Sequence, residues 1–188
     1  MTTSTDIVNE ALQLIGDNQP PVTGVAPGFD TSTAGKAAAL LYGPVVAAVG
    51  RQFEWDFARK TVALALTANT APYPWTYEYS YPSNGIEVWQ LLPGSETDPN
   101  NPLPYNFAVG NAIVSGAQAR VIWTNLASAY CTYNNNPNEN TWDALFHQAV
   151  VRLLASGLSM ALAGKPDLAN LMIQSGAAFE TIGEQRDN

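Results

Sequence analysis

Residues 51–92 decide the fold, and they read RQFEWDFARKTVALALTANTAPYPWTYEYSYPSNGIEVWQLL. The stretch begins as the end of an alanine-rich helix and turns at residues 55–58, which are Trp-Asp-Phe-Ala. Residues 61–66 then form a run that is typical of a strand. The change of pattern predicts that a helical part of the chain ends here and a β part begins.

A tyrosine-rich segment lies at the centre of this stretch. Aromatic rings occupy every second position from Trp75 to Tyr81, and that period places all four rings on one face of a strand. Residues 82–85, Pro-Ser-Asn-Gly, are typical of a turn, and residues 86–92 predict a second strand paired with the first as a hairpin. Because an isolated hairpin is marginally stable in water, helices on either side are expected to pack around it.

The composition narrows the classes of function. The chain has 188 residues and a net charge of −8, and its 13% of charged residues is about half the usual share of roughly 25%. It has no basic run, which disfavours DNA binding by phosphate neutralisation. A sparsely charged surface suits a subunit buried in an assembly, and it also suits a plain monomer. No apolar run approaches the roughly 18 residues of a membrane span, and residues 1–15 do not resemble a signal peptide.

Four helices are predicted around the β part. The first covers residues 6–15, and the second covers residues 30–54, where Pro44 predicts a kink or a break. The third covers residues 141–163, and the fourth begins at Pro166. The second helix is expected to bury Ala34, Ala38, Leu41, Val45, Ala48 and Phe53. The third is expected to keep a polar stripe of Gln148, Arg152, Ser156 and Ser159. The fourth is expected to face inward with Leu168, Leu171, Met172, Ser175, Phe179 and Ile182.

The remaining segments predict an α+β fold. Residues 105–109 and 112–115 are expected to pair as a hairpin through Gly110-Asn111, residues 120–125 to form a last strand, and residues 134–140 to form a polar loop. We expect a single domain over residues 1–188. In it, a helical bundle of residues 1–58 and 141–188 carries an inserted antiparallel β subdomain at about residues 59–126. The structural core is predicted to contain Trp55, Phe57, Tyr77, Tyr79, Tyr81 and Phe146.

The candidates for chemistry all have plainer structural interpretations. His147 is the only histidine, and catalysis would need it beside a nucleophile such as Cys131 and an orienting carboxylate. With Asp143 one helical turn earlier, a local pair is the expected arrangement. One histidine and one cysteine cannot supply a standard zinc site, and Cys131 alone excludes an internal disulfide. We therefore expect no catalytic residues, no metal and no cofactor.

The order of features along the chain carries a family resemblance. The matching pieces are IVNEALQLIG at 7–16, PPV at 20–22, an alanine-rich helix closing on WDFA at 55–58, a leucine-rich strand, a tyrosine-rich strand ending at 81–82, the strand at 86–92, and LFHQA at 145–149 leading into LLA at 153–155. In this order they resemble the head-to-tail adaptor proteins of tailed bacteriophages, the tail tubular protein A type. The resemblance covers most of the chain.

The resemblance implies a structural virion protein and no enzyme. Such a protein is made in the bacterial cytoplasm and forms a ring, typically of twelve copies, at the neck of the virion. The ring lies under the portal protein, extends the DNA channel and contacts a tail, nozzle or stopper protein, while the genomic DNA passes through without specific binding and no membrane is involved. The resemblance also implies that the C-terminal segment docks on the portal, namely Gly183, Glu184, Gln185, Arg186, Asp187 and Asn188. This short polar segment is expected to be frayed when it is alone.

Three other interpretations of the sequence stay open. A head-completion or stopper protein of the virion neck has the same broad character. A carbohydrate-binding module would use the aromatic hairpin as a stacking platform, with Trp75, Tyr77, Tyr79, Tyr81 and Trp89 open to solvent. A small hydrolase would need His147 and an acid to converge in a pocket.

Overall fold

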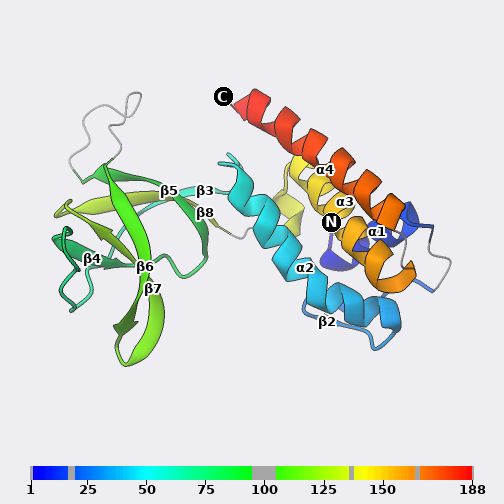
Figure 1. Ribbon diagram of the computed structural model, residues 1–188, viewed down its shortest axis with the longest axis horizontal. Coiled ribbons are helices and arrows are strands. Elements are labelled where there is room, and N and C mark those ends of the chain that lie inside the picture. Colours follow the sequence, from blue (N-terminus) through cyan, green and yellow to red (C-terminus); the bar gives the residue numbers. More distant parts are fainter. Residues whose placement is uncertain (1, 17–19, 95–104, 136–137, 164–165, 188) are drawn as a thin grey trace. The chain divides into compact units, whose positions relative to one another are not determined.

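The chain has a mixed α+β fold, as the sequence predicts (Figure 1). The computed structural model describes residues 2–16, 20–94, 105–135, 138–163 and 166–187, and in these ranges it contains four α helices and three small antiparallel sheets. The chain divides into two compact units. The helical unit comprises Met1–Phe57 and Pro137–Asn188, and the β unit comprises Ala58–Asn136.

The helical unit is organised around its third helix. Helix α3 contacts each of the other three α helices (Figure 1). A five-residue π-helical segment, Ser159–Ala163, follows α3 directly. The bounds of the helices are α1 Ser4–Leu14, α2 Thr33–Gln52, α3 Ala144–Leu158 and α4 Pro166–Asp187.

Local capping explains where α1 begins. The Thr3 hydroxyl accepts a hydrogen bond from the Asp6 backbone N–H, and the Asp6 carboxylate accepts one from the Thr3 backbone N–H at 2.8 Å. This reciprocal capping box satisfies two backbone donors that the first helical turn leaves open. The Asn9 side chain then accepts from the Val22 N–H at 2.8 Å and donates to the Val22 carbonyl at 3.0 Å. These bonds hold the following loop, with its short strands β1 Gly24–Val25 and β2 Gly28–Phe29, against the helix.

Helix α2 differs from its prediction in two ways. It runs unbroken through Pro44, so of the predicted kink or break the break is wrong. Its buried face is also shifted by about one position from the predicted one, because Val46 and Val49 are buried while Ala48 is exposed. The inner face advances in steps of four from Ala34 and Ala38 to Tyr42 and Val46, which is ordinary helical spacing. Tyr42 fixes this face, because its buried ring donates a hydrogen bond from the hydroxyl to the Glu139 carboxylate at 3.0 Å.

The predicted faces of the last two helices also need correction. Ser156 and Ser159, expected on a polar stripe of the third helix, are buried. The Ser159 hydroxyl is satisfied locally, because it donates to the Ser156 carbonyl at 2.8 Å. In α4 the buried residues include Ala169 and Met172, whereas Leu171, predicted to face inward, is 56% exposed.

Six strands make up the two larger sheets, and both sheets lie in the β unit. Their orders are β3-β8-β5 and β4-β7-β6, with all neighbours antiparallel. The predicted hairpin of the tyrosine-rich strand with the next one is therefore wrong, because β4 pairs with β7 and β5 pairs with β8. The bounds of the strands are β3 Arg59–Ala63, β4 Tyr77–Ser80, β5 Gly85–Pro93, β6 Phe107–Val114, β7 Ala117–Thr124 and β8 Ala129–Asn135.

The only hairpin of adjacent long strands in the described β unit joins β6 and β7, and its turn is not the predicted one. Strand β6 runs straight through Gly110 and Asn111, and the chain reverses at Ser115 and Gly116, which have φ angles of 53° and 84°. Two successive positive φ angles suit the right-handed twist of the strands that flank a two-residue turn. Gly110 has a packing reason instead, since a Cβ at that position would overlap the Trp123 ring.

The two three-stranded sheets enclose one core. Isolated bridges join them on both sides, Leu66 to Tyr79 at one seam and Leu91 to Tyr105 at the other. The strands therefore follow one another around the core in the closed order β3-β8-β5-β6-β7-β4. The buried residues of this core are Tyr79, Val88, Leu91, Ile122, Ala129, Cys131 and Tyr133.

Candidate functional site

The outward face of α2 is the strongest candidate for an interaction surface in the helical unit. We call it the α2 stripe, and its exposed members are Ala39, Leu40, Gly43, Pro44 and Ala48. Spacings of three and four residues place them on one side of the helix. Leu40 is 77% exposed, and the sequence has no charged residue between Lys36 and Arg51. Contiguous apolar patches without charge mark surfaces that bind other chains, and Leu40 with Pro44 and the neighbouring alanines is a small patch of this kind.

Pro44 changes the backbone hydrogen bonding of α2 at the α2 stripe. Proline has no N–H, so α2 cannot form its usual bond from residue 44 to the carbonyl of Leu40. The carbonyl of Leu40 therefore lacks its usual donor within the helix. A Cβ added at Gly43 would meet nothing within 4 Å, so the surface beside it is open. The stripe therefore offers one protruding leucine among small residues.

The predicted portal-binding segment belongs to the last helix. Helix α4 extends to Asp187, so Gly183, Glu184, Gln185, Arg186 and Asp187 continue the helix, in contrast to the predicted frayed end. Their side chains, together with Asn188, lie outside the described residues. Earlier in α4, Leu171 and Ile173 are 56% and 47% exposed, which gives this helix apolar surface of its own.

The structure brings the predicted core aromatics of the helical unit together. Trp55 is 1% exposed, and its ring packs edge-on against Phe146 and Phe53, each at 5.2 Å between ring centroids. Phe57 is half-buried and lies 5.1 Å from Phe146. The Trp55 indole N–H donates to the Val49 carbonyl at 3.1 Å, which satisfies one of the carbonyls at the end of α2. These residues hold α2 to α3.

The tyrosines of β4 point into the β unit. Tyr79 is 1% exposed and donates from its hydroxyl to the Leu126 carbonyl at 2.8 Å, while Tyr77 and Tyr81 pack against the same core. The Arg120 guanidinium lies over the Tyr81 ring, 3.9 Å from its centroid. Trp75 precedes β4 and does not extend the row. A sugar-stacking platform needs open ring faces, and the central ring of this row is covered.

His147 has a partner that the sequence did not indicate. Its Nε2 lies 2.7 Å from a Glu10 carboxylate oxygen, and the Gln148 amide donates to the other oxygen at 3.1 Å. The predicted pair with Asp143 is wrong, because Asp143 caps α3 by accepting from the Leu145 N–H at 2.9 Å. The contact between His147 and Glu10 joins α3 to α1, which explains it as a structural link.

Cys131 is buried in β8, and burial raises the pKa of its thiol to about 12. A thiol with so high a pKa is almost entirely protonated at neutral pH, and a protonated thiol is a poor nucleophile. Among the residues that the structure describes, no group of three or more His, Cys, Asp or Glu side chains is placed to hold a metal ion.

A buried carboxylate in the β unit is the most polar cluster that the sequence did not reveal. Glu78 on β4 is 3% exposed, and it accepts hydrogen bonds from the Asn69 amide at 2.7 Å and from the Thr67 hydroxyl and Trp123 indole at 2.8 Å each. Burial raises the pKa of Glu78, but these three donors together lower it more, and the pKa lies below its ordinary value. The Asn69 amide also donates to the Ile113 carbonyl at 2.9 Å, so the cluster ties a loop to the three strands β4, β6 and β7.

The described part of the β unit also has an open groove of about 660 Å³. Its wall is mainly apolar, and none of its lining residues is charged. The larger side chains that line it are Leu64, Leu66, Tyr79, Leu126 and Tyr130. The lining residues include no histidine, cysteine, lysine or carboxylate, so the polar groups of the groove are hydroxyls and backbone groups.

Comparisons with known proteins and the length of the helices complete the description. No protein-family model and no curated protein matches this chain.

In the described part of the chain, the segments Thr33–Gln52 and Ala144–Leu162 are long and apolar enough to cross a membrane by length and composition, which was not predicted from the sequence. Core helices have the same character, and 39% and 50% of the most apolar windows of these two segments are buried inside the protein.

Proposed function

We propose that this protein is a head-to-tail adaptor of a tailed-bacteriophage virion. In this role it forms a ring under the portal protein, extends the DNA channel and connects it to the tail. The α2 stripe is the observation that carries the proposal. An adaptor works through contacts with its neighbours, and the stripe presents the exposed Leu40 on a helix face without charge.

The finer architecture belongs to the same proposal. We infer a helical bundle built from the N-terminal and C-terminal helices, with the β unit as a subdomain inserted between α2 and α3. The contacts of α3 with α1, α2 and α4 support the bundle, and the division of the chain at residues 57 and 137 supports the insertion. In the family that the sequence resembles, the helical part and the C-terminal tail face the portal. The surfaces to test for portal binding are therefore the α2 stripe and the end of α4.

The charge of the chain fits this role. A ring around DNA has to let the DNA slide, and a net charge of −8 repels the phosphate backbone. The sparse charge also reduces the cost of burying surface between subunits, since fewer charged groups have to lose water.

The test mixes the purified chain with the portal protein of the same virus and measures the mass and shape of the product by native mass spectrometry and electron microscopy. We expect a ring of this chain on one end of the portal. Leu40→Glu should abolish the complex, because it places a charge at the centre of the α2 stripe. Leu14→Glu, the same change at a 38% exposed position of α1, is the matched control and should leave assembly intact. Failure of the wild-type chain to bind the portal contradicts the adaptor role, whereas full assembly by Leu40→Glu contradicts the role of the stripe.

A further inference from the structure

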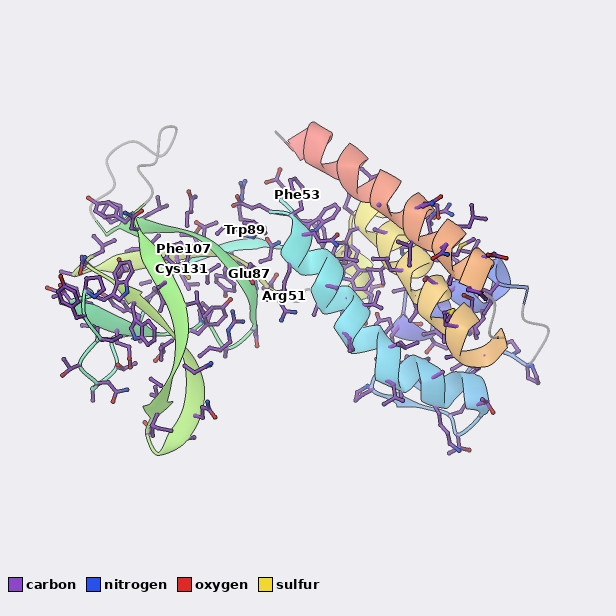
Figure 2. The ribbon with its side chains drawn as sticks, in the orientation of Figure 1. Arg51, Phe53, Glu87, Trp89, Phe107 and Cys131 are labelled. Atoms are coloured by element: carbon purple, nitrogen blue, oxygen red, sulfur yellow. The ribbon has the colours of Figure 1, made fainter. Side chains whose placement is uncertain are left out.

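The turn between β4 and β5 contains a dipeptide with chemistry of its own. Asn84 is followed by Gly85, and no other asparagine in the sequence is followed by glycine. The turn leads into β5, on which Glu87 and Trp89 come next along the chain (Figure 2). The backbone nitrogen of a residue can attack the side-chain amide of an asparagine that precedes it. Glycine has no Cβ to hinder this approach, so Asn-Gly is the asparagine sequence that loses its amide most readily.

The surroundings of Asn84 leave its amide open to this reaction. The side chain is exposed, and it forms no hydrogen bond with any residue in the described ranges of the chain. The Asn9 amide is held in contrast, because its oxygen accepts from the Val22 backbone and its nitrogen donates to it. An amide without such partners can rotate toward the nitrogen of Gly85.

The Gly85 nitrogen is the attacking atom, and one hydrogen bond restrains it. Its N–H donates to the Pro82 carbonyl at 2.9 Å, which closes the turn. The nitrogen has to leave this carbonyl before it attacks, so opening of the turn limits the reaction in the folded protein. Ser83 and Asn84 are exposed, and the first buried residue of β5 is Ile86. The turn can therefore open locally while the core of the β unit stays packed.

We propose that Asn84 is a site of spontaneous deamidation in the folded protein, at a rate set by opening of the turn at residues 82–85. The Gly85 nitrogen bonds to Cγ of Asn84, the bond from Cγ to the side-chain nitrogen breaks, and that nitrogen leaves with the Gly85 proton as ammonia. Water then opens the cyclic imide. Cleavage at Cγ gives aspartate, whereas cleavage at the backbone carbonyl carbon gives isoaspartate. The reaction consumes only water and is independent of the adaptor role.

The two products affect the β unit differently. The turn joins β4 to β5, which belong to the two different sheets around the core. Both products carry a new carboxylate, and this one negative charge takes the net charge from −8 to −9. Isoaspartate also routes the backbone through its own Cβ and Cγ, which lengthens the turn by one methylene and moves the Gly85 N–H away from Pro82. Aspartate keeps the original backbone.

The first test incubates the full chain at mildly alkaline pH, both native and unfolded in urea, and locates deamidation by peptide mass spectrometry. We expect the native chain to react at Asn84 before any other asparagine. The unfolded chain should react about tenfold faster, because the hydrogen bond of the turn no longer restrains the Gly85 nitrogen. Asn111 is the internal control, because it is exposed but is followed by Ala112 in β6, and it should stay unmodified over the same period.

Asn84→Gln is the matched variant. Its longer side chain would have to close a larger and less favourable ring, so residue 84 should keep its amide. A native chain that stays unmodified at Asn84 while the unfolded chain is converted overturns the proposal. Deamidation of Asn111 or of another asparagine before Asn84 overturns it as well.

The second test compares the stability of the products. The aged native chain is separated by ion exchange, and urea unfolding of the isoaspartate form is compared with that of Asn84→Asp. Asn84→Asp has the new charge without the longer backbone, so it should unfold near the wild-type midpoint. The isoaspartate form should unfold at a lower urea concentration. An isoaspartate form as stable as the wild-type chain would contradict the expected effect of the longer turn on the β unit.

Discussion

Removing the Trp55 side chain should destabilise the helical unit strongly. The loss of free energy of unfolding has two parts, one from apolar packing and one from a hydrogen bond. The indole is 1% exposed and packs against Phe53, Phe57 and Phe146. Replacing a large buried aromatic by alanine costs about 3–5 kcal/mol, because it loses the transfer free energy and leaves a cavity. The Val49 carbonyl at the end of α2 would also lose its donor. We therefore expect Trp55→Ala to fall in the upper part of that range.

Trp55→Phe separates the two contributions. Phenylalanine keeps most of the apolar contact but has no N–H, so its main cost is the unsatisfied Val49 carbonyl, about 1–3 kcal/mol. The assay is urea unfolding followed by circular dichroism at a helical wavelength, with the free energy extrapolated to water. A cost below about 1 kcal/mol for Trp55→Ala would refute the placement of Trp55 in the core. Equal costs for the two variants would show that the hydrogen bond carries the whole effect.

Three further predictions concern other parts of the chain. The pKa of Glu78 in the folded protein lies below its ordinary value of 4.5, so the ionised carboxylate stabilises the β unit above pH 4.5. This contribution is lost as the pH falls through the folded pKa. The free energy of unfolding, measured against pH in the acid range, should therefore change less steeply for Glu78→Gln than for the wild-type chain. Gly110→Ala should cost about 1–3 kcal/mol in urea unfolding because its Cβ meets the Trp123 ring, whereas Gly43→Ala should stabilise α2 by about 0.5–1 kcal/mol, and a reversal of these signs contradicts the packing. Cys131 should resist alkylation by iodoacetamide at pH 8 in the folded protein and react on unfolding; rapid labelling of the native chain would mean that the thiol is accessible.

The helices were predictable from the sequence, because each has a start signal and a hydrophobic period. Thr3 together with Asp6 caps α1, Ser32 caps α2, and Pro166 stands at the first position of α4. The expected break at Pro44 failed because one missing hydrogen bond, at an exposed position, costs less than the contacts that the whole of α2 makes with α3. A prediction from the sequence considers the effect of Pro44 alone, whereas the stability of the helix depends on the sum of all its contacts.

The strand pairing was not predictable in the same way. The turn signal at residues 82–85 is real, since the Gly85 N–H donates to the Pro82 carbonyl, but it joins strands of different sheets. Residues 134 and 135 at the end of strand β8 are both asparagine, and the sequence therefore predicted a polar loop there. In the structure both are buried, Asn134 pairs with β3 and β5, and Asn135 pairs with β5. The pairing of strands that are far apart in the sequence depends on how their apolar faces pack into a common core, and a local sequence pattern does not contain that information.

Part of the candidate site could be predicted from the sequence, and part could not. The uncharged interval between Lys36 and Arg51 can be read in the sequence, although only the structure shows that Leu40 points into solvent. The partnership of His147 with Glu10 crosses 137 positions, so no local pattern could indicate it. The same is true of Glu78, whose donors come from a preceding loop and from β7.

The distribution of the few charges carries the last step of the argument. If low charge were only a bias of composition, it would thin the charges evenly over the surface. The charged residues on the strands of the β unit are Arg59, Lys60, Glu78, Glu87 and Arg120, whereas β6 and β8 have none. Helix α2 likewise keeps Lys36 and Arg51 toward its ends and none along the α2 stripe. A charged group that is buried in an interface loses its hydration, which costs free energy. A surface without charged groups therefore binds another chain at a lower cost. The α2 stripe is such an uncharged surface, which agrees with the contact proposed for it.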